Sequence, residues 1–189
     1  MNQEARPPRR ATYQDVIDAP EHMVAEIANG RLHLHPRPAM RHARASFRMA
    51  GQLDGPFQGG PDHPGGWHFA IEPELHFGED VLVPDLAGWR RERMPAYPDA
   101  APFATLAPDW ICEILSPSTR RFDLTEKRAL YGANGVAHLW LLDPEARTLE
   151  TFTLNAGSWT LAAAFQDGET IRAAPFEGLM FPIATLWPG

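Results

Sequence analysis

The chain has 189 residues, of which 44% are hydrophobic and 22% charged, and its formal net charge is -7. This composition is that of an ordinary globular protein and excludes a disordered chain, a coiled coil and collagen, while the length predicts a single domain. The acidic balance argues against strong nonspecific binding to nucleic acids. A single cysteine, Cys112, excludes an intramolecular disulfide and a zinc–thiolate site, and so favours a reducing compartment.

The ends of the chain suggest no targeting signal. No apolar run approaches the roughly 20 residues of a membrane span, and the Arg- and Pro-rich start lacks the apolar region of a signal peptide. We therefore expect a cytoplasmic protein with no membrane-embedded part. Residues 1–10 are predicted to form a flexible tail, and 11–189 a single domain.

A short helix and a β-hairpin are predicted near the N-terminus. Thr12 to Asp15 has the T-x-x-D pattern of a helix start, and Pro20 ends that helix. Two β-like segments, 23–28 and 31–35, flank Asn29-Gly30, which is the strongest short signal for a hairpin turn.

Residues 40–53 are predicted to form a second, amphipathic helix. Apolar residues recur there at helical spacing, and arginines occupy another face. The apolar positions are Met40, Ala43, Phe47 and Ala50, and the arginines are Arg41, Arg44 and Arg48. The stretch 55–66, rich in Gly and Pro, is expected to be a loop.

The rest of the chain predicts strands around one further helix. Strands are expected at 67–71, 74–77, 81–84 (continuing towards Trp89), 110–115 and 138–142, with a turn at 78–80 and a helix from Asp123 to about Ala133. Segments 148–154, 159–165 and 169–171 predict a β meander. The predicted fold class is therefore α/β: a mixed β-sheet flanked by helices, with an N-terminal hairpin and a C-terminal β meander.

Four carboxylates interrupt segments that are otherwise apolar. Glu113 lies within the run 110–115, and Asp85 lies between two apolar stretches; a buried carboxylate needs a cation, a hydrogen-bond donor or a metal. Glu74 is expected on the strand paired with that of Asp85, and Glu26 interrupts the first strand of the hairpin. Together they predict a divalent-cation site with oxygen ligands. Each also has a purely structural alternative, and strand alternation alone would let Glu26 and Glu74 face the solvent.

Lys127 is the only lysine among 17 basic residues. Its spacing from Leu124 and Tyr131 is that of one helix face, so we expect the lysine to point inward towards the carboxylates. An exposed pair with Asp123, or a surface lysine that survived by chance, is the alternative. Cys112 alternates to the strand face opposite Glu113 and is predicted to lie in the core, and His33 and His35 are predicted at the surface.

Several motifs resemble a known family. These are Pro84-Asp85, the stretch WICEILSPST at 110–119, the D-x-x-x-K-x-x-x-Y pattern from Asp123 to Tyr131, Gly135-Val136, Trp140 and Asp143-Pro144. They closely resemble a bacterial family of putative restriction endonucleases in the PD-(D/E)XK nuclease superfamily. The resemblance extends from the Glu26 hairpin through His42 to the C-terminal meander, which is nearly the whole chain.

The resemblance implies a restriction-endonuclease-like core in which Asp85 and Glu113 bind Mg²⁺, or Mn²⁺ in its place. The carbonyl of Ile114 and water molecules are expected to complete the metal shell. The superfamily lysine normally stands two residues after the glutamate, where this chain has Leu115. The resemblance implies that this family instead carries the lysine on the following helix, at the position of Lys127.

The same resemblance implies supporting residues. Glu26 is the additional acid from the N-terminal part, and His42, Glu74 and Tyr131 are candidates to support the metal ligands. One position departs from the family pattern, because the acid usually found two residues before Trp140 is His138 here.

Two functions follow as hypotheses. The first is a Mg²⁺-dependent endonuclease that hydrolyses DNA phosphodiester bonds, with Lys127 orienting or deprotonating the attacking water. Arg41, Arg44 and Arg48 would then contact DNA phosphates, and paired strand cuts would suit a homodimer. The alternative is a catalytically inactive nuclease-fold binding or assembly module, which the acidic charge, Leu115 and His138 favour. Convergence of Asp85, Glu113 and Lys127 on one pocket separates the two hypotheses.

Overall fold

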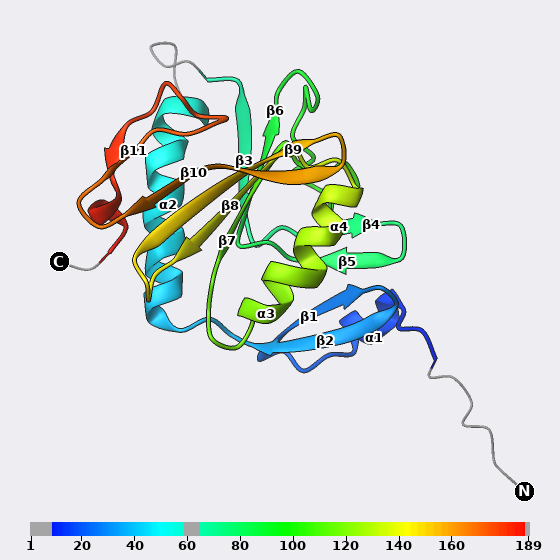
Figure 1. Ribbon diagram of the computed structural model, residues 1–189. Helices are drawn as coiled ribbons and strands as arrows, with labels where there is room; N and C mark the ends of the chain where they lie inside the picture. Colours follow the sequence, from blue (N-terminus) through cyan, green and yellow to red (C-terminus); the bar gives the residue numbers. More distant parts are fainter. Residues whose placement is uncertain (1–8, 59–64, 188–189) are drawn as a thin grey trace, which may run out of the picture.

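The computed structural model describes residues 9–58 and 65–187 (Figure 1). The helical elements are α1 (Tyr13–Ile17), α2 (Met40–Gln58), α3 (Arg120–Phe122), the π-helical turn η1 (Asp123–Lys127), α4 (Arg128–Ala133) and the 3₁₀ turn η2 (Ile183–Leu186). The strands are β1 (Met23–Ala28), β2 (Arg31–Pro36), β3 (Trp67–Ile71), β4 (Leu75–Phe77), β5 (Asp80–Leu82), β6 (Leu86–Arg90), β7 (Trp110–Ile114), β8 (His138–Asp143), β9 (Thr148–Asn155), β10 (Ser158–Gln166), β11 (Thr170–Ile171) and β12 (Phe181–Pro182).

The strands form two main sheets. A six-stranded sheet has the order β10-β9-β8-β7-β6-β3, and a four-stranded sheet has the order β2-β1-β5-β4. The larger sheet is mixed: β7 and β8 are parallel and joined through α3, η1 and α4, whereas its other neighbouring pairs are antiparallel. Helices cover this sheet, with α2 on one face and α4 on the other (Figure 1). The predicted α/β class is confirmed.

The N-terminal hairpin forms as predicted. Asn29 and Gly30 both have positive φ, 54° and 75°, which is the backbone of a tight hairpin turn and explains the Asn-Gly pair. In β1 and β2, Glu26 lies opposite His33 and Ala28 opposite Arg31. Before the hairpin, the Thr12 amide donates to the Asp15 carboxylate at 2.7 Å, so the expected helix start is present.

The central strand β7 divides two apolar clusters. Trp110, Cys112 and Ile114 belong to the cluster under α2, whereas Ile111 packs in the cluster beneath α4, on the face that also carries Glu113. Cys112 is fully buried, as predicted for a core residue, and burial raises the pKa of its thiol well above the usual value. Strand alternation thus sends the carboxylate and the thiol to opposite faces.

The inward face of α2 differs from the prediction. Ala45, Met49, Leu53 and Phe57 line the core, whereas Met40 is 86% exposed and Phe47 72% exposed. Both sets have helical spacing, so periodicity alone did not decide between them. The helix also runs on to Gln58 through Gly55 and Pro56, where a loop was expected, and residues 59–64 of that loop lie outside the described residues.

Two predicted strand arrangements are also wrong. The strand expected to continue from 81 towards Trp89 is broken, because β5 ends at Leu82 in the smaller sheet and β6 begins at Leu86 in the larger one. Pro84, which has no N–H to donate, lies in the gap beside Asp85. At the C-terminus β8, β9 and β10 form a meander, but β11 pairs with β12 and does not extend it.

The described residues include no helix with the length and apolar character that crossing a bilayer requires.

The Asp143 carboxylate links the end of β8 to the start of α3. Its carboxylate pairs with Arg120 and accepts the backbone N–H groups of Glu145 and Ala146, both at 2.9 Å. Burial alone would raise the pKa of Asp143, but these hydrogen bonds outweigh it and hold the pKa below its ordinary value.

Replacing this carboxylate is expected to destabilise the fold. Asp143→Ala removes three hydrogen bonds and should lower the free energy of unfolding by about 2 kcal/mol near neutral pH, measured by urea unfolding. Because the pKa is lowered in the folded state, this contribution is present above the unfolded pKa and is lost as pH falls through the folded one. Asp99→Ala, an exposed control, should change stability by less than about 0.5 kcal/mol. An equal effect of Asp143→Ala at low and neutral pH would contradict this account.

Candidate active site

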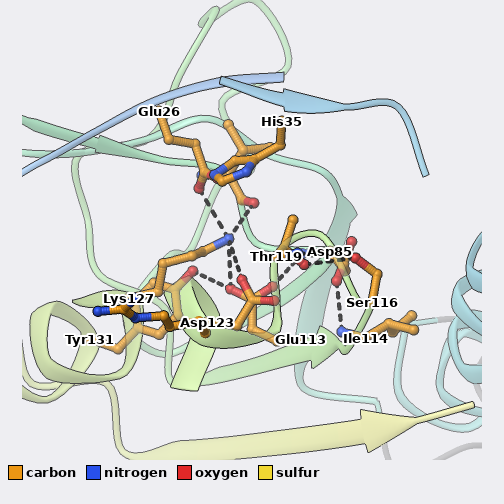
Figure 2. A network of polar contacts seen from close by, with 12 residues as sticks. Glu26, His35, Asp85, Glu113, Ile114, Ser116, Thr119, Asp123, Lys127 and Tyr131 are labelled. Carbon is orange, nitrogen blue, oxygen red and sulfur yellow. Dashed lines mark hydrogen bonds and ion pairs between the residues drawn. The ribbon is translucent and has the colours of Figure 1, made fainter. Parts of the chain in front are cut away.

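A pocket of ≈ 290 Å³ lies where the two sheets meet, and the predicted acidic residues line it. Its walls come from β1, from the segment between β2 and α2, from the gap between β5 and β6, and from the end of β7 with the helix that follows. Figure 2 shows the polar side chains pointing towards one another across it. Its polar lining includes Glu26, His35, His42, Asp85, Glu113, Ser116, Thr119, Asp123 and Lys127.

The ammonium group of Lys127 lies at the centre of this network. Its Nζ is 3.0 Å from Oε1 of Glu26 and 2.9 Å from Oε1 of Glu113, and it donates to the carbonyl of Val83 at 2.9 Å. The lysine side chain is only 4% exposed, so it points inward. Burial by itself would lower the pKa of Lys127, but the charges of Glu113 and Glu26 outweigh burial and hold it well above the usual value. The lysine is therefore a buried cation.

A widened helical turn carries this lysine. The helix begins at Arg120 rather than at Asp123 as predicted, and residues Asp123–Lys127 form a π-helical turn inside it. Such turns are rare and frequently occur at functional sites. Here Asp123 and Lys127 are both buried on the inner side, with Oδ1 of Asp123 3.8 Å from the lysine Nζ.

Glu113 is the most enclosed of the carboxylates. Its side chain is 2% exposed, and besides Lys127 it accepts the hydroxyl of Tyr131 at 2.5 Å. Burial raises the pKa of Glu113 well above its ordinary value, and although Lys127 opposes this, the charges of Asp123 and Asp85 add to it. Burial and the charge of Glu113 raise the pKa of Tyr131, so the phenol stays protonated and donates a hydrogen bond to Glu113.

Asp85 is held beside Glu113 by the broken strand. Its Oδ2 accepts the backbone N–H of Ile114 at 2.6 Å, and its backbone N–H lies 3.4 Å from Oε2 of Glu113. Its Oδ1 is 3.1 Å from Nε2 of His42, which α2 presents from its inner side. Burial would lower the pKa of His42, but the hydrogen bond and the charge of Asp85 outweigh burial and raise it.

The pocket has more negative than positive charge. Glu26, Asp85, Glu113 and Asp123 surround Lys127 as the single buried ammonium. A polar cavity with surplus carboxylates binds cations more readily than anions. The arrangement is therefore able to take up a further cation next to Asp85 and Glu113.

Several polar residues that line the pocket were not predicted as members of the site, among them His35, Ser116, Thr119 and Asp123. His35, expected at the surface, has a side chain 12% exposed and lies 3.8 Å from Oε2 of Glu26, and burial lowers its pKa. Asp123 was predicted to open the helix and to begin the D-x-x-x-K-x-x-x-Y motif, but not to be a site residue, although its spacing from Lys127 was a usable signal. Alternation places His35 on the same side of the hairpin as Glu26's partner His33.

Glu74 does not join the site, contrary to the prediction. It precedes β4, whose first residue Leu75 pairs with Leu82, so Glu74 is out of register with Asp85. Its Oε1 lies 2.7 Å from Nε2 of His76, and it faces other surface hollows rather than the acidic pocket. The alternative that Glu74 serves only a structural role is thus the one the structure supports.

The predicted arginines and the departing histidine lie outside the pocket lining. Arg41, Arg44 and Arg48 are exposed on α2, and Arg41 is 4.0 Å from Glu145. His138 begins β8 opposite Trp110, three positions from the level of Glu113, and does not line the pocket. The substitution at His138 therefore leaves the contacts of the acidic cluster intact.

Metal-binding capacity rests on two carboxylates. Within residues 9–58 and 65–187, no group of three or more His, Cys, Asp and Glu side chains has the arrangement of a metal site. Asp85 and Glu113 nevertheless form a hard oxygen donor pair, and Mg²⁺ is commonly bound through one or two carboxylates while it keeps several water molecules. The residues present fit that mode of binding.

Comparison with known proteins agrees with this architecture. The Uma2 family model, described as putative restriction endonuclease, matches residues 11–184. The chain belongs to the Uma2 family. A similar fold occurs in the crystal structure of a putative nuclease belonging to DUF820 from Anabaena variabilis ATCC 29413, with a TM-score of 0.74 and 21% identity over 93% of this chain and 97% of that one. No curated protein matches the chain. Membership of the Uma2 family confirms the resemblance found in the sequence and supports a nuclease-like function.

The buried Asp123 should make stability depend on pH. Burial raises the pKa of Asp123 to about 6 from 3.8, and the charges of Asp85 and Glu26 add to this against Lys127 and Thr119. Between these two values the folded state binds more protons than the unfolded one, so stability falls as pH rises. Asp123→Asn keeps the shape of the neutral form and should therefore gain about 2 kcal/mol relative to wild type between pH of about 4 and about 7.

Urea unfolding at both pH values measures this difference. Asp99→Asn serves as the control, because its exposed side chain should give the same difference from wild type at each pH. A constant difference between Asp123→Asn and wild type across this range would show that the carboxylate is not desolvated as described.

Proposed function

We propose that the protein is a divalent-metal-dependent endonuclease that hydrolyses phosphodiester bonds in DNA. The observation that carries the proposal is the convergence of Asp85, Glu113 and Lys127 on one pocket, from three separate segments of the chain. Stability alone does not require several buried carboxylates around one lysine, because apolar residues are generally at least as stabilising in a protein core.

Asp85 and Glu113 are the residues that would hold Mg²⁺ or Mn²⁺. The N–H of Ile114 is directed to Asp85, and N–H and C=O of one strand residue leave on the same side, so the Ile114 carbonyl faces the same space. When bound, the metal would supply an activated water molecule and offset the charge that develops on the scissile phosphate. Tyr131 keeps Glu113 in place for this task, and His42 does so for Asp85.

Lys127 acts in this proposal as a fixed positive charge. Its ammonium group forms ion pairs with Glu26 and Glu113 and donates one hydrogen bond to the Val83 carbonyl, and an ammonium has three donors. Of the two roles expected from the sequence, orienting the water and stabilising the charged transition state suits this environment, whereas deprotonating the water requires a neutral amine. The raised pKa of Lys127 opposes that neutral state.

Glu26 is a positioning residue for Lys127. Its Oε1 lies near the lysine ammonium and also accepts the backbone N–H of Val83 at 2.8 Å. The same carboxylate thus links the N-terminal hairpin to the segment that ends in Asp85. Loss of Glu26 would leave the lysine free to turn away from the metal ligands.

Nuclease assays on supercoiled plasmid with Mg²⁺, Mn²⁺ or EDTA test the proposal. Asp85→Asn should abolish both cleavage and the rise in melting temperature that the metal produces in wild type. Lys127→Ala should remove cleavage but keep the metal-induced rise, and Lys127→Arg should not rescue cleavage because a forked guanidinium places its donors elsewhere. Glu26→Gln should slow cleavage by roughly tenfold or more with metal binding retained.

Glu74→Gln is the matched control, because Glu74 is a partly buried carboxylate outside the pocket, and it should cleave like wild type. If calorimetry finds no Mg²⁺ or Mn²⁺ binding to wild type at millimolar concentration, the endonuclease proposal fails. The alternative of an inactive binding or assembly module then takes its place.

Arginines on α2 would contact DNA beside the pocket. Arg41 precedes the pocket residue His42, and Arg48 lies two turns further along the same exposed side of the helix. Replacing both with alanine should weaken DNA binding and reduce the slope of log K against log salt by roughly 2. Filter binding at several salt concentrations measures this slope. Arg31→Ala with Arg172→Ala, two exposed arginines elsewhere, is the control, and an unchanged slope in the α2 variant would exclude this face.

A further inference from the structure

The exposed side of α2 carries a second regular stripe. Successive members are four, three, four and three residues apart, which is the spacing of residues that meet a neighbouring helix. The stripe consists of Met40, Arg44, Phe47, Gly51 and Asp54, all of them exposed. The helix packs on one face of the six-stranded sheet (Figure 1). The stripe lies on the side of α2 opposite Ala45, Met49 and Leu53, which face the core.

An apolar groove runs beside this stripe. It measures ≈ 290 Å³ and lies between α2 and β3, which is an edge strand of the larger sheet. Phe47 and Ile71 line it and are 72% and 56% exposed, and among the described residues Asp54 alone gives its lining a charge. Two large apolar side chains left open to water in one groove are typical of an interaction surface.

The described part of the chain gives no structural reason for a glycine at position 51. A Cβ added there would meet no atom within 4 Å, and its φ is not in the positive range. Glycine inside a helix is destabilising relative to alanine, so a gain elsewhere is expected to offset the loss. An open backbone surface next to Phe47 allows a bulky side chain of another molecule to approach closely.

The charges in the stripe have no partners in the described part of one chain. Arg44 and Asp54 form no ion pair or hydrogen bond with those residues. Ten residues of helix, about 15 Å, separate them, so they do not reach each other.

We propose that α2 pairs with α2 of a second copy of this chain. The two helices are antiparallel, and the two-fold axis between them passes the exposed side of α2 at the level of Met49. Positions 47 and 51 are equally distant from residue 49, and so are positions 44 and 54. One such axis therefore sets Phe47 of each copy over Gly51 of the other, and Arg44 of each copy near Asp54 of the other. A two-fold contact requires a self-complementary surface, and this stripe has that property in both shape and charge.

The proposal assigns separate tasks to the two sides of α2. His42 extends from the inner side into the pocket, and the stripe contacts the second copy. Arg44, which the sequence grouped with the DNA-contacting arginines, belongs to the contact between copies. Arg41 and Arg48 remain outside the stripe.

Sedimentation of the full chain at micromolar concentration tests the contact. Wild type should sediment as a dimer, and Phe47→Asp as a monomer. Arg44→Asp or Asp54→Arg alone should raise the dimer dissociation constant by roughly tenfold or more, because each dimer then has two pairs of like charges. The double variant Arg44→Asp/Asp54→Arg should recover most of the lost affinity.

Arg31→Asp, at an exposed arginine on β2, is the control and should leave the dimer unchanged. Circular dichroism checks that every variant is folded, which is expected because the altered side chains are exposed. A monomeric wild type would overturn the proposal. A dimer that the charge reversals do not weaken, or a double variant no tighter than the single ones, would also overturn it.

Discussion

The geometry of the pocket depends on the contact between one buried ammonium group and the carboxylates around it. Lys127 comes from the helix after β7, Glu113 from β7 itself and Glu26 from the N-terminal hairpin, and the lysine Nζ lies 2.9 Å from Glu113 and 3.0 Å from Glu26. Each charge is costly to bury alone, and together they compensate one another. The two sheets are therefore held together by an electrostatic contact that exists only when all three segments are in place.

The local departures from regular structure serve this contact. The break at Pro84 separates β5 from β6 and leaves Asp85 between the two sheets, where the N–H of Ile114 fixes its carboxylate. Asp123 and Lys127, four residues apart in the π-helical turn, are both buried on its inner side, and alternation along β7 directs Glu113 towards them and Cys112 away. The position of Asp85 depends directly on the break between the two strands.

Much of this could be predicted from the sequence. Asn29-Gly30 identifies the hairpin, and an acid within an apolar strand identifies Glu113, because both signals are local and have few competing explanations. Inward placement of Lys127 followed from its spacing to Tyr131. The resemblance of the motifs to a restriction endonuclease family was needed to relate the distant acids to each other.

The sequence could not decide between local patterns that were equally good. The helix of residues 40–58 has one apolar stripe through Met49 and another through Phe47, and only packing against the sheet shows that the first is buried. Glu74 and Glu26 were equal candidates, and strand register separated them, since Leu75 pairs with Leu82. His35 lines the pocket because the hairpin packs against the helix after β7, with the His35 ring 5.1 Å from that of Phe122, and no short motif encodes this packing.

The presence of a single lysine also determines how the protein responds to amine chemistry. Lys127 supplies the only side-chain amine in the chain, and in the folded state this amine is charged, buried, paired with two carboxylates and hydrogen-bonded to the Val83 carbonyl. Reagents and enzymes that acylate lysine need a neutral, accessible amine. The folded chain therefore has no lysine side chain that these reagents and enzymes can acylate. The rate at which Lys127 is acylated then measures how often the pocket opens.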